Sequence, residues 1–181
     1  FLPHFHIPLQ SGSDTILKAM RRRYKADLFA GRINTIKSIL PEAAIGADVI
    51  VGFPGESNDY FQETYNFLET MDVSYIHVFS YSERDHTDAL KIGPKVKADT
   101  IMEWSKILQK LSNDKKNKFH QQNNGSVREV LIENYDEGFL SGLTENYIRV
   151  KLPGQFEEVN TIISLQMSYT NEEGMKGLRI G

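Results

Sequence analysis

The sequence predicts an α/β protein followed by a small antiparallel β-barrel, and three observations support this fold class. Apolar runs of strand length alternate with amphipathic helical patterns through the first two thirds of the chain. From Gln121 onward the pattern changes to short alternating strands separated by turn residues. The length of 181 residues is enough for one sizeable core and a second, smaller one. We therefore expect two domains, at residues 1–122 and 123–181.

The first domain is expected to contain three parallel strands. They lie at residues 5–10, 49–51 and 75–82, and each ends in a polar or glycine-rich turn. The middle run has no polar alternation, which is typical of a parallel strand covered on both faces. Apolar residues recur at helical spacing between these strands, from Phe29 to Leu40 and from Phe61 to Met71. Strands and helices in this order predict right-handed βαβ units whose turns meet at one end.

These three turns would form one ligand site, because α/β proteins bind ligands at the carboxyl ends of parallel strands. The turn after the second strand is the most informative, since Gly52 and Gly55 leave the backbone bare beside the carboxylate of Glu56. A small ligand is the expected occupant. The alternative is an ordinary turn whose glycines only relieve steric strain, because short glycine motifs also arise by chance.

A long helix, expected at residues 99–119, leads to the second domain. Five short strands follow it, at residues 127–133, 138–142, 147–152, 160–166 and 177–180. Residues 124–181 carry a net charge of −4, whereas residues 1–123 carry +1. Phosphate contacts dominate nucleic-acid affinity, so the charge of this domain by itself argues against RNA binding.

Four motifs occur in an order that resembles a known family. They lie at residues 6–14, 20–24, 48–56 and 77–84, and they resemble the second half of the radical-SAM barrel of the methylthiotransferases. Within that family the chain is most similar to the MtaB-like branch, which modifies threonylcarbamoyl-adenosine beside the anticodon of tRNA. The last third resembles the TRAM domain that ends these enzymes and binds RNA. The resemblance covers nearly the whole chain.

The resemblance implies three βα units of a partial (β/α) radical-SAM barrel, followed by a TRAM-like barrel. The family uses S-adenosylmethionine and four-iron four-sulfur clusters, which cysteine thiolates hold. This chain has no cysteine. We therefore expect an inactive fragment of an enzyme whose cluster-binding half lies elsewhere. The resemblance and the lack of a long apolar run imply a cytoplasmic protein that binds tRNA and no membrane. Unpaired strand edges predict self-association.

The resemblance also implies which residues bind the cofactor. Gln10 and Ser11 match the family's Gln-Ser-Gly-Ser turn and would hydrogen-bond the ribose or the amino-acid end of S-adenosylmethionine. Arg22 matches the arginine of the family's Met-x-Arg-x-Tyr pattern, and its planar guanidinium suits the cofactor carboxylate. The alternatives for Arg22 are a solvated helix end or a contact with RNA phosphates. The remaining expected cofactor residues are Val51, Gly52, Pro54, Gly55, Glu56 and Phe79. For Glu56 the alternative is a charge favoured by the helix dipole.

The resemblance to an RNA-binding domain implies a contact face in residues 123–181. Arg128, Arg149 and Lys151 would lie on it, with Tyr147 as a surface for base stacking. The alternative is a core tyrosine among solvated surface charges. The sequence departs from the family at His86, which replaces a glycine and leaves the choice of substrate open.

The histidines suggest a metal site of another enzyme class. His4 and His6 lie two apart on one expected strand, and His77 lies on another. Barrel metal sites gather at the carboxyl ends of strands, which these histidines precede, so we expect packed or hydrogen-bonded histidines and no metal. Two further functions remain open: a sibling methylthiotransferase for isopentenyl-adenosine in tRNA or for a ribosomal protein, and a non-catalytic RNA-binding scaffold.

Overall fold

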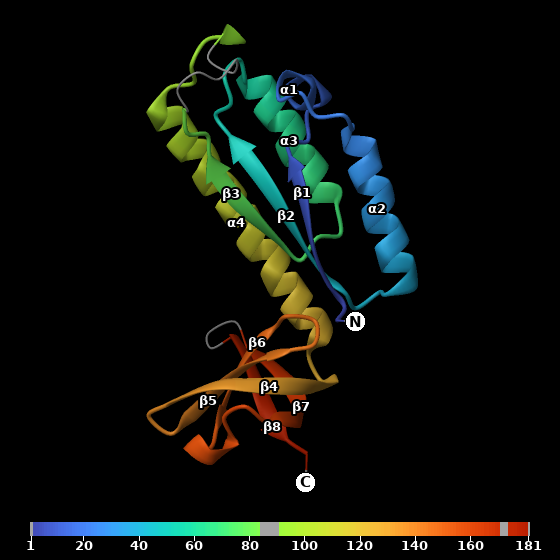
Figure 1. Ribbon diagram of the computed structural model, residues 1–181, viewed down its shortest axis with the longest axis vertical. Coiled ribbons are helices and arrows are strands. Elements are labelled where there is room, and N and C mark those ends of the chain that lie inside the picture. The colour runs from blue at the N-terminus through green and yellow to red at the C-terminus, as the bar shows by residue number, and fades with distance from the viewer. Residues whose placement is uncertain (1, 84–90, 171–173, 181) are drawn as a thin grey trace. The chain divides into compact units, whose positions relative to one another are not determined.

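The computed structural model describes residues 2–83, 91–170 and 174–180, and it divides into two compact units (Figure 1). The parallel-sheet unit comprises residues 5–41 and 45–115. The barrel unit begins at Lys116 and also includes residues 42–44 and a short N-terminal piece that ends at His4. The sequence placed the division a few residues later, after residue 122.

A three-stranded sheet, in the order β1-β2-β3, forms the centre of the parallel-sheet unit. Its strands are β1 His4–Gln10, β2 Ala44–Val51 and β3 Tyr75–Ser80, and all three lie where the sequence predicts strands. β2 and β3 pair in parallel with Asp48 opposite His77. The three arrows point the same way in Figure 1, so the carboxyl ends of the strands meet at one edge.

Four helices accompany these strands: α1 Asp14–Ala19, α2 Ala26–Ile39, α3 Asn58–Thr70 and α4 Ala98–Asn123. The hydroxyl of Ser57 accepts a hydrogen bond from the N–H of Tyr60, which is the cap expected at the start of α3. α2 ends before Pro41, as helices usually do ahead of a proline. No described helix is long and apolar enough to cross a bilayer.

Apolar side chains of α2, α3 and α4 cover one face of the sheet, where Val49, Val51 and Leu9 are fully buried. The intervening strand residues point to the opposite face, which we call the open face; its members include His6, Asp48, His77 and Phe79. The sequence predicted a middle strand covered on both faces. Within the described residues the sheet is covered on one, and Ile50 on the other side is only half-buried.

Five strands of the barrel unit close into a barrel in the order β4-β5-β6-β8-β7. They are β4 Val127–Asp136, β5 Phe139–Thr144, β6 Arg149–Pro153, β7 Ile162–Thr170 and β8 Gly174–Arg179, which confirms the five strands expected from the sequence. A short 3-10 helix, Phe156–Glu158, precedes β7. Alternate apolar residues fill the interior, including Val130, Ile132, Leu140, Val150 and Leu165.

Candidate functional site

The end of β1 and the arginine-rich segment after α1 form one constellation. Gln10 is buried with a φ of 72°, and its side-chain oxygen accepts a hydrogen bond of 3.0 Å from Arg22 Nη2. The hydroxyl of Tyr24 donates to the carbonyl of Leu9 at 3.2 Å. The structure thus brings together two sequence motifs that were expected to share a site. Arg22 is exposed, and a guanidinium has five N–H donors, so it can bind an anion while it remains bonded to Gln10.

The hydroxyl of Ser11 is engaged within the protein. It lies 3.1 Å from Thr64 Oγ1 of α3 and accepts a hydrogen bond of 3.1 Å from the N–H of Ser13. Ser11 is fully buried, and the N–H of Gly12 donates to the same threonine oxygen. Ser11 therefore fastens the first turn to α3 and is a positioning residue rather than an exposed ligand contact.

Glu56 folds back onto the turn that follows β2. Its Oε2 accepts a hydrogen bond of 2.6 Å from the N–H of Gly52. Burial raises the pKa of Glu56 to about 7, although backbone hydrogen bonds at Gly52 and Phe53 oppose that shift. The carboxyl group thus closes its own turn and titrates near neutral pH.

Both turn glycines adopt a backbone conformation that favours glycine. Gly52 has a φ of +84°, and a Cβ there would lie 2.5 Å from the side chain of Ile101. Gly55 has a φ of +86°, and its N–H donates to the carbonyl of Pro94 at 2.9 Å. Positive φ therefore favours glycine at both positions, and at Gly52 the side chain of Ile101 also leaves no room for a Cβ.

The apolar residues expected at the site differ in position. Val51 is fully buried and belongs to the core under the helices, so it supports the turn from behind and cannot touch a ligand on the open face. Pro54 is also buried. Phe79 is 50% exposed on the open face, where a ligand can reach it.

A basic cleft of about 800 Å³ adjoins Arg22 on the surface formed by α1, α2 and the segment between them. Its lining residues are Asp14, Thr15, Lys18, Arg22, Arg23, Tyr24, Lys25 and Leu28. The lining contains four cationic side chains and one carboxylate, so the cleft favours the binding of an anion. Both roles predicted from the sequence for Arg22 therefore suit this cleft: a contact with RNA phosphates and a contact with the cofactor carboxylate.

Arg128 does not lie on an exposed face of the barrel unit. Its side chain is 9% exposed, and its guanidinium donates to Glu145 at 2.9 Å and to Glu42 at 2.7 Å. It also donates to Asn123 Oδ1 at 3.0 Å. Burial lowers the pKa of Arg128, but the hydrogen bonds and charges of Glu145 and Glu42 outweigh this effect and raise it. Arg128 is a buried structural cation, which corrects its sequence-based placement on an RNA face.

The other three expected RNA contacts are accessible. Tyr147 is 55% exposed, and its ring stacks on His4 with centroids 4.1 Å apart. Arg149 and Lys151 alternate with buried residues along β6 and point outward. Arg149 pairs with Glu133 at 3.3 Å, and Lys151 lies opposite Lys176 of β8. The tyrosine is not a core residue, so the alternative interpretation for it is wrong.

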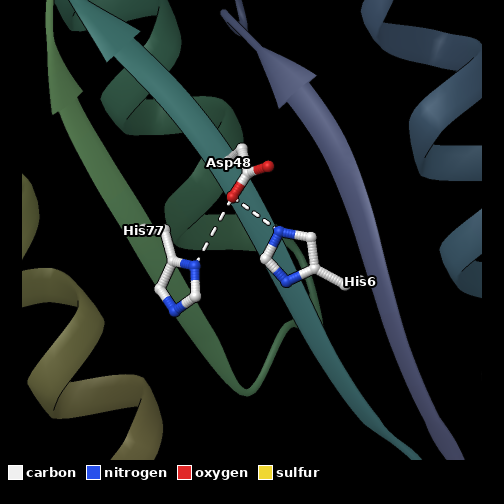
Figure 2. A group of neighbouring side chains, drawn as sticks. All are labelled: His6, Asp48 and His77. Atoms are coloured by element: carbon white, nitrogen blue, oxygen red, sulfur yellow. Dashed lines mark hydrogen bonds and ion pairs between the residues drawn. The ribbon is translucent and has the colours of Figure 1, made fainter.

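His6, Asp48 and His77 form a cluster that the sequence analysis did not assemble (Figure 2). His6 Nε2 lies 2.6 Å from Asp48 Oδ1, and His77 Nδ1 lies 3.5 Å from the same oxygen. His4 stacks on Tyr147 and His6 is hydrogen-bonded to Asp48, which confirms the expectation of packed or hydrogen-bonded histidines for these two. The alternation of strand residues was a usable signal, since all three members fall on the same face of expected strands. His86 lies outside the described residues.

Comparisons with known proteins agree with the resemblance drawn from the motifs. Residues 2–68 match the family model described as the Radical SAM superfamily. The chain is 42% identical over 161 residues to the threonylcarbamoyladenosine tRNA methylthiotransferase MtaB of Aquifex aeolicus, a match that covers 89% of this chain and 38% of that protein. It is 38% identical to the protein of the same name from Bacillus subtilis, over 94% of this chain and 40% of the relative.

A third relative bears a different name. The chain is 32% identical to the tRNA-2-methylthio-N(6)-dimethylallyladenosine synthase of Syntrophotalea carbinolica, over 98% of this chain and 41% of that protein. The chain thus spans about two fifths of the length of the curated relatives that it matches.

Proposed function

We propose that this chain, which is related over nearly its whole length to radical-SAM methylthiotransferases, is part of an enzyme that modifies threonylcarbamoyladenosine in tRNA. The observation that carries the proposal is the level of identity. It is 42% and 38% for two relatives with that name, against 32% for the relative named for dimethylallyladenosine. A sibling activity on the second nucleoside is the competing function.

The architecture supports the same proposal. In the parallel-sheet unit, each strand is followed along the chain by helix, and the helices cover one face of the sheet. That arrangement suits three βα units of a larger (β/α) barrel whose interior is the open face. The closed five-stranded barrel suits a TRAM-like RNA-binding domain.

The proposed cofactor site lies at the carboxyl ends of β1 and β2. Arg22 would hold the carboxylate of S-adenosylmethionine, and Gln10 would orient the guanidinium through their 3.0 Å hydrogen bond. Gly52, Gly55 and Glu56 would shape the adjoining turn, and Phe79 would offer an apolar surface. S-adenosylmethionine and an iron-sulfur cluster supply radical chemistry when bound. The chain has no cysteine, so thiolate ligands for the cluster would come from outside these 181 residues.

The proposed tRNA contact lies on the outer surface of the barrel unit. Tyr147 offers an exposed ring, and Arg149 and Lys151 project from neighbouring outward positions of β6. Lys176 of β8, opposite Lys151, adds a further cation to this stripe. Local segregation of basic residues would allow phosphate binding despite the net charge of −4 over residues 124–181.

Mass spectrometry of total tRNA nucleosides, from cells with and without the full-length gene, tests the proposed activity. Specific loss of the methylthio form of threonylcarbamoyladenosine is the expected result. Loss of the dimethylallyl counterpart would assign the sibling activity. No change in either nucleoside would overturn the tRNA modification and point to a protein substrate or a scaffold.

Reintroduced variants of the full-length protein test the cofactor site. Arg22→Ala is expected to abolish the modification, because it removes the cation proposed for the cofactor carboxylate. Arg23→Ala is the matched control, since Arg23 is a neighbouring exposed arginine that also lines the basic cleft. Equal loss in both variants would indicate a general role of the cleft charge instead.

A further inference from the structure

Three potential metal ligands meet on the open face of the parallel sheet. They are an imidazole nitrogen of His6, a carboxylate oxygen of Asp48 and an imidazole nitrogen of His77, and they all lie within 4.8 Å of one another. The carboxylate lies between the two imidazole rings, which approach it from neighbouring strands (Figure 2). Each of the three strands therefore contributes one potential ligand to the same cluster.

The strand register explains why these side chains converge. Asp48 and His77 are direct partners in the parallel pairing of β2 and β3, and β1 flanks β2 on its other side. Adjacent strands lie about 4.8 Å apart, which brings side chains on the same face into contact. Neighbouring residues on the covered face are buried, among them Val49 and Ile76. The backbone that carries the ligands is therefore anchored in the core, as a preorganised site requires.

We propose that His6, Asp48 and His77 bind a divalent metal ion of the zinc class. Two imidazoles and one carboxylate form a ligand set that zinc uses in sites with an open coordination position. Magnesium and calcium prefer oxygen ligands, so the two nitrogen donors select against them. The open position lies on the open face of the sheet, where the side chains of His6 and His77 are 38% and 53% exposed in this chain. It can accept water or a polar atom of a ligand.

Zinc binding requires the three ligand atoms to move toward equal spacing. Zinc bonds of about 2.0–2.1 Å in tetrahedral geometry place ligand atoms about 3.3 Å apart. His77 Nδ1 and Asp48 Oδ1 already lie 3.5 Å apart. His6 Nε2 would move away from Asp48 Oδ1, from their present 2.6 Å. A partly exposed imidazole can make that movement by side-chain rotation alone.

This metal site is separate from the proposed cofactor site. His6 precedes Gln10 by four residues, which corresponds to about 13 Å along a strand. The ligands also share no hydrogen bond with the Gln10 and Arg22 pair among those described. Zinc binding at this cluster therefore does not depend on S-adenosylmethionine binding.

Zinc binding by the 181-residue chain, purified without a histidine tag, tests the inference. Titration calorimetry and elemental analysis are expected to give one zinc ion per chain. Asp48→Asn and His77→Ala should each weaken binding by at least roughly tenfold, since even the loss of a residue that only supports a metal ligand costs 10- to 100-fold. His4→Ala is the matched control, because it removes a histidine of the same strand outside the cluster, and it should bind zinc like the wild type.

Asp48→Asn also separates metal binding from a hydrogen-bonded cluster. Asparagine keeps the shape and still accepts a hydrogen bond from an imidazole, but it lacks the anionic oxygen that binds zinc well. Circular dichroism checks that each variant is folded, and His77→Gln replaces His77→Ala if the latter is not. A wild-type chain that binds no zinc would overturn the inference. Binding that is unchanged in both cluster variants, or equally weakened by His4→Ala, would overturn it too.

Discussion

The two units of this protein differ in how a buried ionisable group is compensated. In the parallel-sheet unit, the carboxyl group of Glu56 is buried against the backbone of its own turn, and burial raises its pKa to about 7. In the barrel unit, the guanidinium of Arg128 is buried between the carboxylates of Glu42 and Glu145, which raise its pKa. The first group can change its charge near neutral pH, whereas the second keeps a permanent charge.

This difference follows the architecture of the units. The parallel sheet has one open face and a row of turns at the ends of its strands, where unusual groups can meet a ligand. The barrel closes its sheet through the pairing of β4 with β7. The buried guanidinium of Arg128 on β4 therefore holds strand β4 to the loops that carry Glu42 and Glu145. We therefore expect changes at Glu56 to alter pH dependence and changes at Arg128 to alter stability at every pH.

The largest expected effect is the pH dependence that Glu56 imposes on unfolding. Its pKa in the folded state is about 7, above the ordinary value of 4.5, so the folded state binds the proton more tightly. The stability that Glu56 contributes is therefore fully present below about pH 4.5 and is lost as the pH rises through about 7, a change of up to about 3 kcal/mol. Glu56→Gln should remove this slope, as urea unfolding at pH 5 and pH 8 would show.

The exposed Glu63 of α3 provides the control for this measurement. Glu63→Gln should keep the wild-type slope between pH 5 and pH 8. Parallel slopes for the wild type and Glu56→Gln would show that Glu56 is ionised in the folded state across this range. The contrast between the two units would then be lost.

Arg128→Ala should lower the free energy of unfolding by about 2–3 kcal/mol, because it removes a buried cation from two carboxylates. Arg179→Ala is the control, since Arg179 pairs with Glu158 at 2.6 Å but is half exposed. An exposed ion pair contributes less than about 1 kcal/mol. Chemical denaturation at pH 7 measures both values, and equal losses would contradict a special role for the buried pair.

A smaller difference in stability, between two glycine variants, tests how tightly the turn around Glu56 is packed. Gly52→Ala and Gly55→Ala each place a side chain at positive φ, which costs about 1–2 kcal/mol. A Cβ at Gly52 would lie 2.5 Å from the side chain of Ile101, whereas a Cβ at Gly55 would meet only Gly93 Cα at 3.8 Å, so the Gly52 substitution should cost about 1 kcal/mol more. If thermal or chemical unfolding gave the two variants the same stability, the contact with Ile101 would not constrain the turn.

Local signals in the sequence predicted most of the fold. The positions of the strands, the helical periodicity and the Ser57 cap depend on neighbouring residues, and the structure confirms them, although β2 begins at Ala44, five residues before the apolar run that predicted it. The roles of individual site residues were harder to predict from the sequence. The run at 49–51 shows that the strand is apolar, but only the packed sheet shows that Val51 faces the core. The partners of Arg128 could not be predicted either, because Glu42 is 86 residues away in the sequence.

The cluster of His6, Asp48 and His77 could be predicted from the sequence only in part. Alternation along each strand places all three side chains on one face, and that much is readable from the sequence. Their convergence also requires the register of β2 against β3, which pairs Asp48 with His77 and which no local pattern specifies. The sequence grouped His4 with His6 and His77, whereas the structure stacks His4 on Tyr147 and adds Asp48 to the other two.

The smallest expected effect on stability, and the sharpest test of the barrel surface, comes from Arg149 and Lys151. Both point outward from β6, so their joint replacement by Ala should leave the unfolding free energy within about 0.5 kcal/mol of the wild type. If they bind tRNA phosphates, affinity of the 181-residue chain for tRNA should fall about tenfold. The slope of log affinity against log salt should decrease in magnitude by about 2, one for each lost phosphate contact.

Arg179→Ala serves again as the control, because it removes one outward cation of the barrel unit that lies outside the proposed contact. Filter binding or fluorescence anisotropy across a range of salt concentrations would measure both slopes. A salt slope that the double substitution leaves unchanged would exclude this face from tRNA binding. The exposed cations of β6 would then be surface charges, in contrast to the buried cation of Arg128, whose role is structural.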